Sequence, residues 1–167
     1  MLCALAVILL LTATLANRSM ASKSSISQTI KGDGFVVLEL FTSEGCSSCP
    51  PADELLAKVQ REAGDKPVYA LSYHVDYWDN QGWRDVFSNR DYSKRQYDYA
   101  SKLRAQVYTP QVVVNGKTEF VGSNESAMNY AIASGLAGSS VSTLQLQGKQ
   151  QGGKMSLSYQ ITGKTSE

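Results

Sequence analysis

Two cysteines separated by two residues lie between an apolar run and a helical pattern, and this junction constrains the fold more than any other stretch. The run 35–41 (FVVLELF) is short, β-branched and aromatic, and glycine and polar residues bound it, so it predicts a buried strand. After the cysteines, apolar residues recur at helical spacing until Gly64, with Pro67 beyond. The sequence therefore predicts a strand that passes into a helix through a loop holding Cys46 and Cys49.

The predicted position of Cys46 at a helix start favours its thiolate. The unpaired amides and the positive dipole end of a helix stabilise an anion, so the thiolate gains over the thiol. Such a thiolate attacks disulfides readily and also leaves readily. Cys49, one turn deeper and less exposed, would then be the resolving thiol. This chemistry needs no cofactor beyond the redox-active disulfide Cys46–Cys49.

Two other interpretations of the pair stay open from the residues alone. A closed structural zinc site needs about four nitrogen or sulfur ligands, whereas the chain offers only Cys3 and His74 besides the pair. An inert disulfide that closes so short a loop would constrain the unfolded chain little. This weak stabilisation favours redox use of the pair over a purely structural role.

The first residues have the composition of a secretory signal. The apolar stretch 3–16 is shorter than the ~20 residues of a membrane-spanning helix, and small residues follow it up to Ala21. We expect residues 1–21 to be a signal peptide, residues 22–31 to be a loose polar leader, and the protein to be secreted or periplasmic. No stable membrane insertion is expected after cleavage, and an uncleaved anchor is the alternative. After export and removal of the signal peptide with Cys3, the mature chain would keep only Cys46 and Cys49. We therefore expect the disulfide to be the resting state in an oxidising compartment.

The charge balance bounds the kind of partner. Lys+Arg of 16 against Asp+Glu of 15 favours neither nucleic acid nor an anionic membrane. We therefore expect protein or small-molecule thiols and disulfides as partners.

With 167 residues and 43% hydrophobic content, the chain can bury one core. We expect that core in residues 32–138, followed by an extension over residues 139–167.

A second strand over residues 67–75 follows the helix, so the pattern indicates a βαβ unit with a parallel pair. The carboxyl ends of parallel strands share one edge of a sheet, which would bring His74 and Asp76 towards the cysteines. His74, the single histidine, is interpreted either as a hydrogen-bonded structural residue or as an auxiliary acid, base or ligand. Together, Cys46, Cys49 and His74 would suit Cu(I). An exported copper chaperone is therefore the alternative function, with copper as its cargo.

The remaining patterns complete an α/β fold. We expect a second helix from near Ser88, a hairpin around Asn115-Gly116, a third helix from Ser123 and a C-terminal hairpin around Gly152-Gly153. Trp78 and Trp83 are interpreted as packing residues, because buried aromatic rings more often fill a core than bind a substrate.

The order of elements, with a C-x-x-C pair after the first strand and a Thr-Pro pair before the hairpin, is similar to the thioredoxin fold. This resemblance implies a cis bond between Thr109 and Pro110 that lies against the cysteines and positions an extended substrate chain. Allowing one extra residue, Glu39 matches the buried carboxylate of thioredoxins, which implies proton transfer to the second cysteine. The chain departs from thioredoxins at Gly45, where they have tryptophan, and at Pro50-Pro51.

More closely, several motifs in the same order resemble the DUF1223 family of secreted thioredoxin-like proteins. They are Glu39–Asp53 with the C-S-S-C pair, His74–Asp79, Gly82-Trp83, and Tyr108–Gln111 with Val114–Gly116. The resemblance runs over about 35–123. It implies an exported thiol-disulfide oxidoreductase-like protein in which Cys46 attacks and Cys49 resolves. A non-catalytic interaction module with a static disulfide is the remaining alternative.

Overall fold

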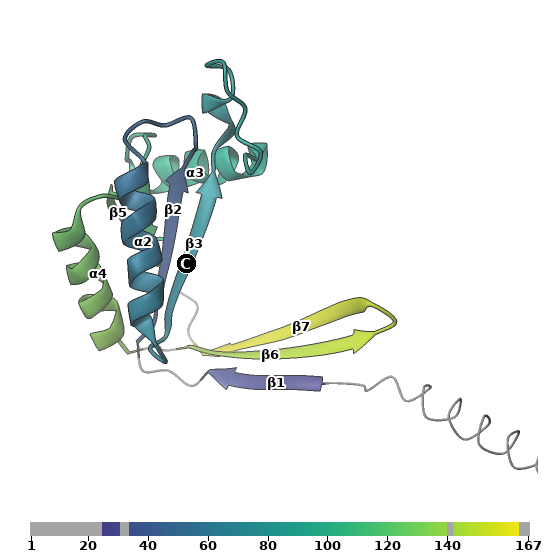
Figure 1. Cartoon of the computed structure of the whole chain (residues 1–167). Coiled ribbons are helices and arrows are strands. Elements are labelled where there is room, and N and C mark those ends of the chain that lie inside the picture. Colours follow the sequence, from purple (N-terminus) through teal and green to yellow (C-terminus); the bar gives the residue numbers. More distant parts are fainter. Residues whose placement is uncertain (1–24, 31–33, 140–141, 164–167) are drawn as a thin grey trace, which may run out of the picture. The chain divides into compact units, whose positions relative to one another are not determined.

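The computed structural model describes residues 25–30, 34–139 and 142–163, which form two compact units (Figure 1). The larger unit is Gly32–Ser140, and the smaller combines Met1–Lys31 with Val141–Glu167. The predicted signal peptide lies outside the described residues. Among the described residues, no helix is long and apolar enough to cross a membrane.

The larger unit contains a mixed four-stranded sheet in the order β3-β2-β4-β5. Its strands are β2 (Val36–Thr42), β3 (Val68–His74), β4 (Gln111–Val114) and β5 (Thr118–Val121). Strand β2 pairs parallel with β3 and antiparallel with β4, as the βαβ and hairpin patterns predict. Asn115 and Gly116 both adopt positive φ between β4 and β5, which explains their choice at this hairpin.

Helices cover both faces of this sheet. They are α2 (Pro50–Ala63), α3 (Arg90–Leu103) and α4 (Glu125–Ala137), with the short 3-10 helix η1 at Asp76–Trp78. Figure 1 shows α2 and α4 on one face and α3 on the other, near the carboxyl ends of β2 and β3. The predicted class, an α/β fold with a mixed sheet flanked by helices and a C-terminal hairpin, is confirmed.

The alternation of β2 divides the core between the two faces, since successive side chains of a strand point to opposite sides. Val36, Leu38 and Leu40 are fully buried in the cluster that includes residues of α2 and α4. Phe41 is fully buried in a second cluster with residues of α3. Val36, Leu38 and Leu40 therefore face α2 and α4, whereas Phe41, on the opposite side of the strand, faces α3.

The smaller unit is a three-stranded antiparallel sheet in the order β1-β6-β7. The predicted C-terminal hairpin is formed by β6 (Ser142–Gln151) and β7 (Lys154–Gly163), with Gly152 and Gly153 at positive φ in its turn. Strand β1 (Ser25–Ile30) was not predicted, because this part of the chain has the polar composition of a leader. Its pairing partner, β6, lies far along the chain, so no local pattern reveals it.

Candidate functional site

Cys46 and Cys49 form a disulfide at the point where β2 passes into α2, with an S–S distance of 2.13 Å. Cys49 is the N-cap of α2 and has helical φ and ψ, although Pro50 follows it. The prolines are tolerated because the first amides of a helix have no partner within it. Cys46 is 2% exposed and Cys49 is fully buried, so the oxidised pair has little access to solvent.

Thr109 and Pro110 lie beside the first cysteine. The bond between them is cis, and the Thr109 hydroxyl donates to Cys46 Sγ at 3.3 Å. The structure therefore brings together four residues that the sequence analysis placed in one site. A hydroxyl donor on this sulfur is suited to stabilise a thiolate, because hydrogen bonds to the charged form favour it.

Trp78 fixes the position of Thr109. Its Nε1 donates to Thr109 Oγ1 at 2.9 Å, and it also packs against the cluster around Phe41. A Cβ atom at Gly45 would lie 3.3 Å from Trp78 Cβ, so the loop before Cys46 has little room for a larger residue. The sequence interpretation of Trp78 as a packing residue missed its bond to Thr109, which is 31 residues away.

His74 is held by Asp85, a residue that the sequence analysis did not single out. His74 Nδ1 lies 2.6 Å from Asp85 Oδ2, and the same oxygen accepts the Glu44 amide at 2.9 Å. The Phe87 amide donates to the other carboxylate oxygen at 2.9 Å. Asp85 is 1% exposed. Burial acts to raise the pKa of Asp85, but these hydrogen bonds outweigh burial and lower it.

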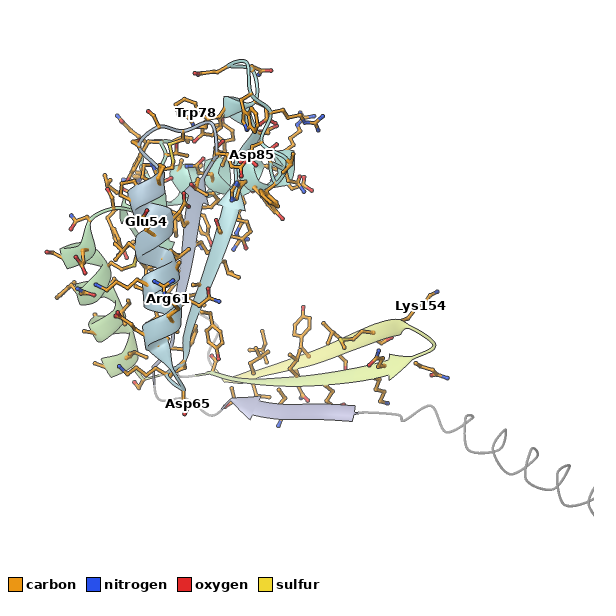
Figure 2. All side chains as sticks on the ribbon, viewed as in Figure 1. Glu54, Arg61, Asp65, Trp78, Asp85 and Lys154 are labelled. Atoms are coloured by element: carbon orange, nitrogen blue, oxygen red, sulfur yellow. A yellow bond between two sulfur atoms is a disulfide. The ribbon has the colours of Figure 1, made fainter. Side chains whose placement is uncertain are left out.

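Asp85 thus joins the end of β3 to the loop that carries Cys46. Figure 2 shows Asp85 and Trp78 at one end of the sheet and Asp65 at the opposite end. The structure does not bring Asp76 to His74. The Asp76 carboxylate accepts from the Ser93 hydroxyl, and this pair joins η1 to α3.

Asp53 is a further polar residue in the first turn of α2, and its amide donates to the Cys49 carbonyl. The Thr42 hydroxyl donates to Asp53 Oδ2 at 3.1 Å, and Thr42 is fully buried at the end of β2. Burial raises the pKa of Asp53, while the Thr42 hydrogen bond and the charge of His74 act in the opposite direction. The spacing from Cys49 to Asp53 is one helical turn, which is the signal by which the sequence could have indicated this residue.

Glu39 lies on the α3 face of the sheet, and the structure does not bring it together with the two sulfurs. Its carboxylate accepts from Arg95 Nε at 2.5 Å and from the Tyr99 hydroxyl at 2.6 Å. Arg95 also stacks over the rings of Tyr73 and Tyr99. Burial and the neighbouring Glu39 raise the pKa of Tyr99 to about 12, so it remains a donor. The predicted proton-transfer role of Glu39 stays a prediction.

Three exposed apolar side chains lie in the segment between η1 and α3. Trp83, Val86 and Phe87 are 62%, 78% and 61% exposed, and we call them the apolar loop patch. The interpretation of Trp83 as a packing residue is therefore wrong. The Phe87 ring lies edge-on to His74, with 5.4 Å between the ring centroids. The patch therefore adjoins the residues that hold the disulfide loop.

Among the described residues, no group of three or more His, Cys, Asp or Glu side chains could hold a metal ion. The copper alternative stays a prediction, since binding would first require reduction of the disulfide.

The fold and the site define a class: α/β proteins with a mixed sheet, helices on both faces, and a disulfide at a strand–helix junction beside a cis-proline. The chain belongs to the DUF1223 family, described as a protein of unknown function, whose model matches residues 37–167. It is similar to the crystal structure of protein AGR_C_4864 from Agrobacterium tumefaciens, with 29% identity and a TM-score of 0.58. That match covers 80% of this chain and 74% of the other. A comparison with curated proteins finds no match.

Proposed function

We propose that this protein is an exported thiol-disulfide oxidoreductase. The observation that carries the proposal is the Cys46–Cys49 disulfide at the start of α2, with the Thr109 hydroxyl on Cys46 Sγ beside cis-Pro110. A helix start and a hydroxyl donor both stabilise a thiolate on the first cysteine. The location outside the cytoplasm follows from the predicted signal peptide and is part of the proposal.

The proposed exchange is a two-electron transfer between the cysteine pair and a partner. The Cys46 thiolate attacks one sulfur of a partner disulfide, and the second partner sulfur leaves as a thiolate. Cys49 then attacks Cys46 Sγ, so the Cys46–Cys49 bond forms and the bond to the partner breaks. The partner disulfide is reduced to two thiols, and the cysteine pair is oxidised. The reverse sequence oxidises a partner dithiol.

The proposal predicts that a Cys49→Ala variant accumulates mixed disulfides through Cys46, because the resolving thiol is absent. We would measure the adducts by non-reducing electrophoresis after acid quenching and identify the linked cysteine by mass spectrometry. Cys46→Ala is the matched control and should form none. A Cys49→Ala protein that forms no adduct with model disulfides, or forms it through Cys3, would contradict the proposal.

The apolar loop patch supports a polypeptide as the partner rather than a small thiol. Burying one large apolar side chain contributes about 1.5–3 kcal/mol. Replacing Trp83, Val86 and Phe87 together by serine should therefore slow exchange with a disulfide-bonded protein by about tenfold or more.

Exchange of the same triple variant with oxidised glutathione should change by less than about twofold, because a small disulfide buries little apolar area. Tyr130→Ser is the control, since Tyr130 is 77% exposed on α4, outside the patch. Equal slowing with both substrates would show that the patch supports the site and does not bind the partner.

A further inference from the structure

We propose that Asp53 accepts the proton of the Cys49 thiol as this thiol attacks the mixed disulfide, and that the Thr42 hydroxyl positions this carboxylate. The proposal rests on the proposed function and names the base for its second step. It is independent of Glu39, whose carboxylate is engaged on the other face of the sheet.

Helical geometry places Asp53 next to Cys49. The Asp53 amide donates to the Cys49 carbonyl at 3.1 Å, and Cys49 has helical φ and ψ. Residues four apart in a helix share one face, with about 5–6 Å between their Cβ atoms. This spacing allows the Asp53 carboxylate to reach the Cys49 sulfur, directly or through one water molecule.

Thr42 directs the carboxylate from the opposite side. Its buried hydroxyl donates to Asp53 Oδ2, and among the described residues no donor contacts the other oxygen, Oδ1. Thr42 follows Leu40 by two residues and Leu38 by four on β2. Because alternate residues of a strand point to the same face, the side chain of Thr42 points to the face of the sheet that α2 covers. One oxygen is thus fixed and the other is left to accept a proton.

The charged groups acting on Asp53 are His74, at the end of β3, and Asp85, in the loop before α3. Positive charge on His74 favours the ionised Asp53, and the negative charge of Asp85 disfavours it. Burial is the largest effect and raises the pKa of Asp53 above its ordinary value, which brings it closer to that of a thiol. A smaller difference between donor and acceptor makes the proton transfer less unfavourable.

The step balances as a proton transfer coupled to exchange. The proton moves from Cys49 Sγ to the Asp53 carboxylate, and the resulting thiolate attacks Cys46 Sγ. The Cys46–Cys49 bond forms, the partner leaves as a thiolate, and protonated Asp53 returns its proton to the partner or to solvent. No further oxidant or reductant is required.

The test measures a single resolution step. The reduced protein is mixed with oxidised glutathione, and the release of glutathione from the Cys46 adduct is followed by rapid quenching between about pH 5 and pH 9. Asp53→Asn should slow release by about 100-fold near neutral pH. The difference should shrink as the pH approaches about 8.5, where the thiol ionises unaided. Formation of the adduct by Cys46 should be unchanged.

Glu54→Gln, which changes the exposed carboxylate next to Asp53 on α2, is the matched control and should leave release unchanged. Glu39→Gln tests the competing assignment of this proton transfer to Glu39. Thr42→Val, which removes only the donor to Asp53, should give an intermediate slowing and provides the test if Asp53→Asn does not fold. An Asp53→Asn protein with the wild-type pH profile, or a larger effect from Glu39→Gln, would overturn the assignment. A Cys49→Ala protein that forms no adduct at Cys46 would overturn the proposed function and this step with it.

Discussion

Replacing Asp85 with asparagine should lower the free energy of unfolding by about 2–4 kcal/mol, a large loss for a single substitution. The carboxylate is 1% exposed and accepts from His74 and from the amides of Glu44 and Phe87. An asparagine side chain has only one acceptor oxygen. Its NH2 group would face the buried backbone amide of either Glu44 or Phe87, and that amide would lose its hydrogen-bond partner. Urea denaturation monitored by circular dichroism measures the change.

The pH dependence gives an independent check on Asp85. Its pKa is lowered in the folded protein, so its contribution is fully present above the unfolded value of about 3.9 and is lost as the pH falls through the folded pKa. The difference between wild type and Asp85→Asn should therefore shrink in acid. Asp65→Asn, at the opposite end of the sheet, is the control and should change stability by less than about 0.5 kcal/mol. A pH-independent difference would show that charge is not the cause.

Replacing Arg95 with methionine should destabilise the protein by about 2–4 kcal/mol, because it leaves a buried carboxylate without its counter-charge. Glu39 is 3% exposed, and Tyr99 would be its remaining hydrogen-bond donor. This expected loss of stability is smaller than that for breaking a fully buried ion pair, because the Arg95 side chain is 45% exposed to water.

A second substitution tests the mechanism of this loss. Glu39→Leu combined with Arg95→Met removes both charges, and the double variant should regain most of the stability, as a buried pair often can be replaced by apolar groups. Lys94→Met breaks an exposed ion pair with Asp98 on the same helix and should have no measurable effect. A double variant as unstable as Arg95→Met would point to lost packing of the Arg95 stem instead. Thermal and urea unfolding of the four proteins give the comparison.

Local patterns were sufficient to predict most of the fold. The apolar runs predicted β2 and β3, Asn115-Gly116 predicted the turn between β4 and β5, and Gly152-Gly153 predicted the turn of the C-terminal hairpin. Helix α3 begins at Arg90 because the Asn89 side chain caps it, slightly later than predicted. These features depend on residues close together in the sequence, which is why the sequence indicates them.

The support of the site could not be predicted in the same way. Asp85 reaches the Glu44 amide across 41 residues, and Arg95 reaches Glu39 across 56. Such hydrogen bonds depend on how loops close after the sheet has formed, and no periodicity encodes them. Glu39 shows the difficulty most clearly, because a shift of one position along a strand reverses the face on which a side chain lies.

The enclosure of the oxidised pair has a kinetic consequence. A nucleophile must approach a disulfide along the sulfur–sulfur axis, and Cys46 leaves only 2% of its surface open for that approach. Diffusing thiols such as glutathione should then reduce the resting protein slowly, even where the equilibrium favours reduction. Under the proposed function, the disulfide would persist until a polypeptide partner contacts the apolar loop patch and displaces the Thr109 hydroxyl from Cys46 Sγ.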